Sequence, residues 1–320
     1  MSDEFDPEAI FEGAFGVPEE ENPLEDFLER VNEIKSGTLN QRLLKIQHLL
    51  DGMNVSHYDL GSPHNWEDWL QEETDDSYDW IIPDLLERGE RVIVVAAEGV
   101  GKSFLARQVA IMTAAGLHPF TGGRMKPLKT LTIDLENPDR ILRRTSRRIM
   151  NMAREKTWMK SNETINAHLL LKPAGVNLFD PAQKKAVEEV IKELKPDILF
   201  MGPLYKSFIE QGGRSAESQA TEIAMYYDYL RYEYDVALWL EQHAPLGNAL
   251  QGRDLRPFGS AVWSRWPEFG LALSPDATVP GSYVVKFFRG ARDQRPWPET
   301  MHRGSSLDFP FVVDSFRSVQ

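Results

Sequence analysis

The sequence predicts an α/β protein whose central sheet is mostly parallel and flanked by helices. The first observation is a strand-like segment, Val92 to Val95, that runs into a glycine-rich loop and then into an amphipathic helix near Lys102. The second is an alternation of strand-like and helix-like segments as far as residue 241, which is typical of parallel strands joined by helices. The third is a run of strand-like segments after residue 259 with no long helix between them, which predicts an antiparallel C-terminal extension.

The spacing of apolar residues locates these elements. It predicts strands at 91–96, 129–135, 168–172, 197–201 and 236–241, followed by strands at 268–273, 282–288 and 309–313. It predicts helices at 102–115, 138–156, 181–194 and 217–234.

The first part of the chain differs from the rest in charge. Residues 1–80 hold 21 Asp/Glu and four Lys/Arg, a net charge of −17, whereas residues 81–320 carry +4. We expect residues 1–23 to be an acidic disordered leader, 24–78 a small helical segment and linker, and 79–320 the main domain. The leader is either a solubilising tail or a peptide that docks in a basic groove. The mildly basic main domain permits a polyanionic partner.

The composition excludes several classes of protein. The chain has no cysteine, which excludes disulfides, cysteine-ligated zinc and thiol catalysis and is compatible with the cytoplasm. It has no apolar run of about 18 residues, and its N-terminus is acidic, so neither a membrane span nor secretion is indicated.

The glycine-rich loop carries the most specific motif. It matches most of the phosphate-binding pattern G-x-x-x-x-G-K-[ST], with Ala96 in place of the first glycine. Its backbone N–H groups can surround an anion, and the following helix directs its positive end to the same place. Lys102 would reach the β- and γ-phosphates of a nucleoside triphosphate, and the hydroxyl of Ser103 would hold Mg²⁺. The residues expected to bind the nucleotide are Ala97, Glu98, Gly99, Val100, Gly101, Lys102, Ser103 and Phe104.

Two carboxylates follow the next predicted strand, Asp134 and Glu136. In a parallel sheet this edge is where phosphates bind. Glu136 is therefore our candidate for the residue that orients the attacking water. The alternative is that it caps the following helix, although Asp139 could serve that purpose.

The order of these features resembles the RecA-type ATPases, and within them the RepA/DnaB-like branch of plasmid and phage replicative helicases. The resemblance covers about residues 79–300 and rests on the phosphate loop, the strand ending in Glu136, the apolar strand after Pro196-Asp197 and the strand ending in His243. Segments 79–89, 202–206 and 297–299 are similar to phage and actinobacterial AAA-family ATPases. The resemblance implies ATP and Mg²⁺ as cofactors, and a homo-oligomer, a hexameric ring, acting on single-stranded DNA. It also implies replication or recombination proteins as partners and the bacterial host cytoplasm as location.

The resemblance also implies roles for single residues. Glu136 would be the catalytic glutamate, and His243 would sense the γ-phosphate. Arg289 or Arg292, in the basic segment 286–292, would reach the γ-phosphate bound by a neighbouring subunit. The DNA-binding loops would be 206–214 and 244–259, with Lys206, Arg214, Arg253 and Arg256. Ordinary surface loops and a basic surface hairpin are the alternatives.

One position departs from the family pattern. The strand 197–201 should end in an aspartate that holds Mg²⁺ through water, and Gly202 stands there instead. Either Ser103 and water hold the metal, with Asp134 as a possible substitute, or hydrolysis is weak. Two functions therefore remain open: an ATP-dependent DNA motor, and a nucleotide-dependent regulatory protein with weak or no hydrolysis. A small-molecule kinase is a third option, against which the segment 286–292 and the strand ending in His243 argue.

Overall fold

The computed structural model describes residues 62–71, 77–160, 162–244, 257–290 and 295–316. The chain divides into two units, Met1–Asp75 and Asp76–Gln320. In the first unit the described residues contain one short helix, α4 (Trp66–Leu70), which begins where the side chain of Asn65 accepts hydrogen bonds from two backbone N–H groups. The expectations for the acidic leader and for the helices before residue 62 lie outside the described residues.

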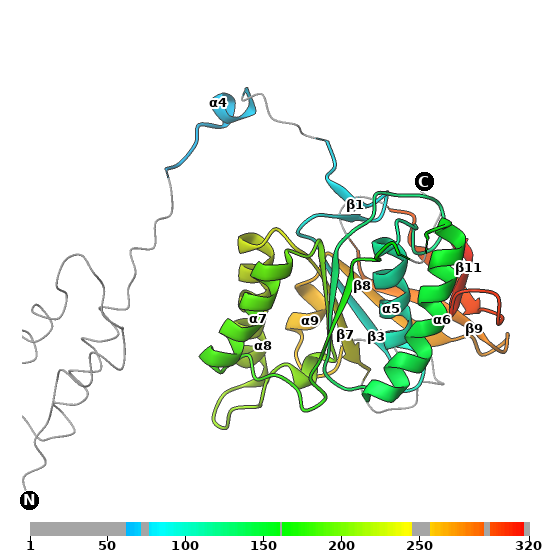
Figure 1. The fold of residues 1–320 in the computed structure, drawn as a ribbon. Coiled ribbons are helices and arrows are strands. Elements are labelled where there is room, and N and C mark those ends of the chain that lie inside the picture. Colours follow the sequence, from blue (N-terminus) through cyan, green and yellow to red (C-terminus); the bar gives the residue numbers. More distant parts are fainter. Residues whose placement is uncertain (1–61, 72–76, 161, 245–256, 291–294, 317–320) are drawn as a thin grey trace, which may run out of the picture. The chain divides into compact units, whose positions relative to one another are not determined.

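The second unit is built on a mixed sheet (Figure 1). Its strands are β3 (Arg91–Ala96), β4 (Thr130–Asp134), β5 (Ala167–Leu171), β6 (Ile198–Gly202), β7 (Ala237–His243), β8 (Phe269–Pro275), β9 (Ser282–Arg289), β10 (Pro298–Arg303) and β11 (Phe311–Phe316). Among the described residues their order is β11-β10-β9-β8-β3-β7-β6-β4-β5. The strands from β8 to β5 are parallel, and β9, β10 and β11 are antiparallel. A separate hairpin of β1 (Trp80–Ile82) and β2 (Leu86–Glu87) precedes β3. The predicted fold class, a mostly parallel α/β sheet with an antiparallel extension, is confirmed.

The helices lie close to where the apolar spacing predicts them. They are α5 (Lys102–Ala114), α6 (Asp139–Thr157), α7 (Pro181–Leu194), α8 (Ala216–Glu233) and α9 (Val262–Arg265), with a 3₁₀ turn η1 (Leu204–Lys206). Local signals explain their starts: α7 has Asp180 as its N-cap and a proline at its first position, and α8 is capped by the hydroxyl of Ser215. Within the described part of the chain, no helix is long and apolar enough to cross a membrane.

The core lies on both faces of the sheet. Because side chains alternate along a strand, Val92 and Val94 of β3 join the apolar cluster that includes α5, whereas Ile93 and Val95 join the cluster that includes α7 and α8. Figure 1 shows α5 and α6 on one side of the sheet and α7, α8 and α9 on the other. This double covering explains why β3, β6 and β7 are almost entirely buried.

The parallel strands place their carboxyl ends at one edge of the sheet. In the register, Ala96 of β3 pairs with His243 of β7, and Asp134 of β4 pairs with Gly202 of β6. Since ligands of open α/β sheets bind outside the carboxyl ends of the strands, this edge is the place to look for a site.

Candidate nucleotide site

The phosphate loop connects β3 to α5. Gly99 has φ 76° and Gly101 has φ 112°, both in the left-handed region that residues with a Cβ rarely adopt. Gly101 directly precedes the first residue of α5, so the loop and the first turn of the helix present their backbone N–H groups together. The sequence motif therefore forms the local geometry that an anion site requires.

Lys102 is the first residue of α5, and only 7% of it is exposed. Burial lowers the pKa of Lys102, and the nearby charges of Glu241, Glu136 and Glu98 oppose that shift. The side chain is a cation held away from water next to acidic groups. A phosphate at the loop would provide the same kind of partner.

Ser103 points to a carboxylate that the sequence analysis did not select. Its Oγ–H donates to Oε2 of Glu241, on β7, with 2.7 Å between the oxygens. Burial raises the pKa of Glu241 to about 7, and Asp134 adds to the rise, although Ser103, Lys102 and Arg107 favour the charged form. The sequence does contain a signal for this residue: Glu241 is an acid that directly follows the apolar run 236–240.

Three side chains meet beyond the loop. The hydroxyl of Tyr205 donates to Oε1 of Glu136 at 3.2 Å, and Nε2 of His243 lies 3.7 Å from Oε2 of Glu136. The rings of Tyr205 and His243 are 5.4 Å apart, centroid to centroid. Burial, and then Lys102, lower the pKa of His243, whereas Glu136 raises it. The predicted catalytic and sensing residues thus lie together, and Tyr205 joins them from the segment 202–206 that the sequence singled out.

Asp134 is engaged in the turn after β4. Its Oδ1 accepts hydrogen bonds from the backbone N–H groups of Glu136 (3.0 Å) and Asn137 (2.7 Å). The side-chain amide of Asn137 donates to both carboxylate oxygens. Asp134 therefore shapes the turn that presents Glu136, and a role in holding metal, which stays a prediction, would compete with these bonds.

The antiparallel extension reaches back to the loop through Arg303 of β10. Nη2 of Arg303 donates to the backbone oxygen of Val100 at 2.6 Å, and its Nε donates to the hydroxyl of Tyr283 at 2.9 Å. The guanidinium lies 4.5 Å from the ring centroid of Phe311. This contact joins residues about 200 positions apart, and the sequence analysis did not find it.

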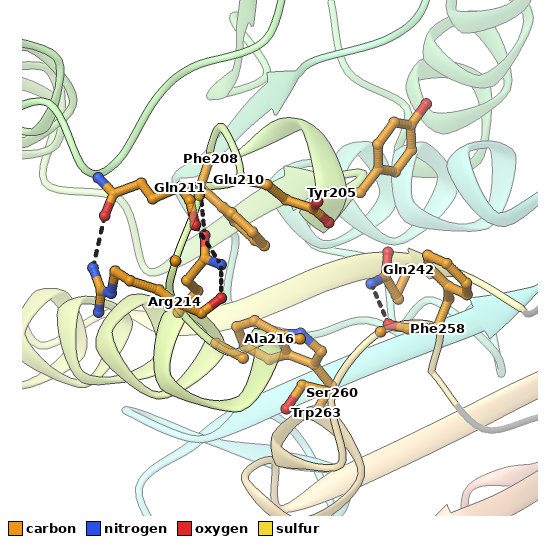
Figure 2. Close-up of a pocket in the computed structure, with 15 residues that line it drawn as sticks. Tyr205, Phe208, Glu210, Gln211, Arg214, Ala216, Gln242, Phe258, Ser260 and Trp263 are labelled. Carbon is orange, nitrogen blue, oxygen red and sulfur yellow. Dashed lines mark hydrogen bonds between the residues drawn. The ribbon is translucent and has the colours of Figure 1, made fainter.

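A cavity of about 390 Å³, shown in Figure 2, includes Tyr205 of the three-residue group in its lining. Gln242 at the end of β7 also lines it, and the segment after β6, the start of α8, and the segment 258–260 with Trp263 of α9 line the rest. Of the predicted DNA-contacting residues, Arg214 forms an ion pair with Glu222 at 2.7 Å and Lys206 donates to a backbone oxygen. Arg253 and Arg256 lie outside the described residues.

The predicted arginine finger lies far from its own loop along the sheet. β9 runs antiparallel to β8, so Arg289 pairs with Gly270 at the amino end of β8. The phosphate loop follows the carboxyl end of β3, next to Leu273 at the other end of β8. Arg289 is therefore at the opposite edge of the sheet from its own phosphate loop. Arg292 lies outside the described residues.

Comparison with known proteins places the chain in a family. A family model described as an AAA domain matches residues 58–249, more than half of the chain. A KaiC-like protein from the hyperthermophilic archaeon Pyrococcus horikoshii OT3 is similar in structure, with 16% sequence identity and a TM-score of 0.45 over 71% of this chain and 90% of that one. No curated protein matches the chain. The family match spans the phosphate loop and the carboxyl ends of β4, β6 and β7, and the chain belongs to the AAA domain family.

Proposed function

We propose that the protein is an ATP-dependent DNA motor or remodelling ATPase that acts on single-stranded DNA as a homo-oligomer, a hexameric ring. It would act in helicase-type replication or in recombination, with proteins of those processes as partners. The observation that supports this proposal best is the group of Glu136, Tyr205 and His243. Along the chain, Tyr205 and His243 directly precede the two segments to which DNA binding is assigned.

The residues at the loop fit ATP with Mg²⁺, the cofactors of P-loop ATPases. Lys102 is a buried cation at the helix start, and the hydroxyl of Ser103 lies beside the carboxylate of Glu241. A hydroxyl and a carboxylate are ligands that Mg²⁺ accepts, and Mg²⁺ keeps several waters in such sites. When bound, ATP would supply the phosphoryl group that is transferred to water, and Mg²⁺ would neutralise part of the negative charge of the phosphates.

In this proposal the three-residue group acts on the water and on the γ-phosphate. Glu136 orients the water, and the hydroxyl of Tyr205 fixes the carboxylate of Glu136 by its hydrogen bond. Nε2 of His243 is buried and has no hydrogen-bond partner among the described residues. Nε2 lies 3.7 Å from Oε2 of Glu136, beyond hydrogen-bond distance, so a phosphate oxygen within that distance would give it a partner and His243 would respond to the presence of the γ-phosphate.

The same residues begin the segments assigned to DNA. Tyr205 directly precedes the segment 206–214, and His243 directly precedes the segment 244–259. The side chain of Gln242 connects to the second segment by donating to the backbone oxygen of Phe258 at 2.9 Å (Figure 2). A change in the contacts of His243 would thereby reach both sides of the cavity. Lys206, Arg214, Arg253 and Arg256 would then contact phosphates of the DNA.

The position of Arg289 supports an oligomer. Arg289 lies at the edge opposite its own phosphate loop, so a γ-phosphate that it contacts would belong to a neighbouring subunit. Arg289, or Arg292 three positions later, would stabilise negative charge on the neighbour's γ-phosphate during hydrolysis.

Steady-state ATP hydrolysis with and without single-stranded DNA tests the proposal. We expect DNA to stimulate the wild-type protein, and we expect Glu136→Gln to lower kcat about 10²- to 10⁴-fold because the water loses its orienting carboxylate. Nucleotide binding should persist in that variant. Glu193→Gln, which removes an exposed carboxylate on α7, is the matched control and should behave as wild type. An ATP hydrolysis rate of the wild-type protein that is the same with and without single-stranded DNA would contradict the motor.

A second function is supported by Gly202. The expected aspartate is missing from β6, as it would be in a nucleotide-dependent binding or regulatory protein with weak or no hydrolysis. In that case the protein would bind ATP tightly, turn it over negligibly and show no effect of DNA. Light scattering would then detect a change of oligomeric state when ATP binds.

A further inference from the structure

Glu241 occupies an unusual place for a carboxylate. β7 runs Ala237-Leu-Trp-Leu-Glu-Gln-His243, and the four residues before Glu241 are buried. In the register Glu241 pairs with Val94, whose side chain belongs to the apolar cluster on the α5 side of the sheet. Paired residues of neighbouring strands share a face, so the carboxylate of Glu241 lies on the α5 side, where it meets Ser103.

Glu241 also stands at the level of Gly202. Met201 of β6 pairs with Leu240 of β7, so the next residues along the two strands, Gly202 and Glu241, are neighbours. A Cβ placed on Gly202 would lie 2.5 Å from Cβ of Glu241 and 3.2 Å from its Cγ. Real Cβ atoms do not approach that closely, so a side chain at residue 202 and the present side chain of Glu241 exclude each other.

We propose that Glu241 supplies the carboxylate for the Mg²⁺ that binds at Ser103, so that the metal-holding acid of this chain has moved from β6 to β7. The proposal rests on the nucleotide site proposed above. It explains two observations together: the glycine at the end of β6, and the glutamate in a buried strand whose oxygen lies 2.7 Å from the hydroxyl of Ser103.

The two carboxylates at the end of β4 and just after it are engaged elsewhere. Both oxygens of Asp134 accept hydrogen bonds from Asn137, and one of them also accepts from the backbone of Glu136. The oxygens of Glu136 face Tyr205 and His243. Among the described residues, Glu241 is the acid that is hydrogen-bonded to Ser103.

The surroundings of Glu241 favour a cation at this place. Its Oε2 already faces the hydroxyl of Ser103 at 2.7 Å, on the α5 side of the sheet. A divalent cation bound by Ser103 would lie within reach of this carboxylate and would attract it. The carboxylate and the metal would therefore stabilise each other.

Binding of Mn²⁺, as a spectroscopic probe for Mg²⁺, tests the proposal without turnover. Electron paramagnetic resonance measures free Mn²⁺ in the presence of the full-length protein and ADP or a slowly hydrolysed ATP analogue. We expect Glu241→Gln to weaken Mn²⁺ binding about 10- to 100-fold, the range found when a partner in a metal site is removed. Nucleotide binding in excess EDTA should change little. Glu193→Gln should match the wild type in both measurements.

A pair of substitutions separates metal binding from a purely structural role. Gly202→Asp alone places the family's aspartate against Glu241 and should destabilise the fold. Combined with Glu241→Gly, which removes the Cβ that lies 2.5 Å from the new one, the same aspartate gains room and should restore Mn²⁺ binding to within about threefold of wild type, whereas Glu241→Gly alone stays weak. This non-additivity is expected only if either position can supply the carboxylate that holds the metal. Thermal melting of each variant reports whether it folds.

Two results would overturn the proposal. The first is Mn²⁺ binding by a folded Glu241→Gln variant that equals the wild type. The second is a folded Gly202→Asp/Glu241→Gly variant that binds Mn²⁺ no better than Glu241→Gly. Both are distinguishable from a failure of the DNA motor, because a protein that binds Mn²⁺·nucleotide through Glu241 but shows no response to DNA contradicts only the motor.

Discussion

Arg303 stabilises the phosphate loop from the far end of the sequence, and its removal should measurably destabilise the protein. Its guanidinium donates to the backbone oxygen of Val100 and to the hydroxyl of Tyr283, and it lies against the ring of Phe311. Hydrogen bonds from a charged donor contribute about 1.5–3 kcal/mol each, and a part-exposed cation–π contact contributes about 0.5–1 kcal/mol. Glutamine at this position recovers part of one hydrogen bond. We therefore expect Arg303→Gln to lower the free energy of unfolding by about 2–4 kcal/mol.

Equilibrium urea denaturation measures this loss. With a slope of about 2 kcal/mol per M urea, a loss of 3 kcal/mol moves the midpoint by about 1.5 M. Arg303→Lys keeps the charge but not the planar fork, so it should fall between glutamine and wild type. The affinity for a fluorescent ADP analogue should fall in the same order, because the loop loses the contact that holds Val100.

Arg265→Gln is the control for Arg303, since Arg265 is an exposed arginine at the end of α9. It should change the free energy of unfolding by less than about 0.5 kcal/mol, as most surface substitutions do, which moves the urea midpoint by less than about 0.25 M. If Arg303→Gln and Arg265→Gln shift the midpoint equally, the argument that the extension supports the loop is wrong.

Three further outcomes are expected. Tyr205→Phe should lower kcat for ATP by about two- to tenfold, because Glu136 loses one hydrogen bond, while nucleotide affinity measured by titration stays unchanged. Gly101→Ala should lower the free energy of unfolding in urea by about 1–3 kcal/mol and weaken nucleotide binding. Its φ is 112°, and the new Cβ would lie 2.6 Å from the guanidinium of Arg303. Burial alone would raise the pKa of Glu268, but the hydrogen bonds and charge of Arg91 lower it below the usual 4.5. The ionised form therefore stabilises the fold above about pH 4.5 and this contribution is lost as the pH falls through the lowered pKa, a decline that Glu268→Gln should lack when unfolding is followed against pH.

Local features explain how far the fold could be predicted. The ends of α5, α6, α7 and α8 lie within one residue of the predicted ends, because apolar periodicity and capping residues act over a few positions. β10 was not predicted. It starts at Pro298 and runs through polar residues, and a proline is tolerated at the first position of a strand without marking one.

The site was predictable where one motif contains its chemistry. The phosphate loop is a continuous pattern, and the carboxyl end of a parallel strand is a defined place for Glu136. Tyr205, Glu241 and Arg303 escaped prediction because their roles depend on register and on contacts between distant segments. Tyr205 is 69 residues from Glu136, and Arg303 is 203 residues from Val100. A sequence pattern does not show which residues so far apart along the chain lie in contact in the fold.

The exchange between Gly202 and Glu241 shows why an absent motif residue is weak evidence for an absent function. Neighbouring strands are about 4.8 Å apart, so residues at the same level on β6 and β7 can direct a side chain to nearly the same point. β7 lies between β6 and β3, which brings residue 241 closer to the phosphate loop than residue 202. The requirement at such a site is a carboxylate at that level of the sheet and on the α5 side, and either strand can supply it. A glycine at residue 202 is then the expected consequence of a side chain at residue 241, because a Cβ on residue 202 would lie 2.5 Å from the Cβ of Glu241.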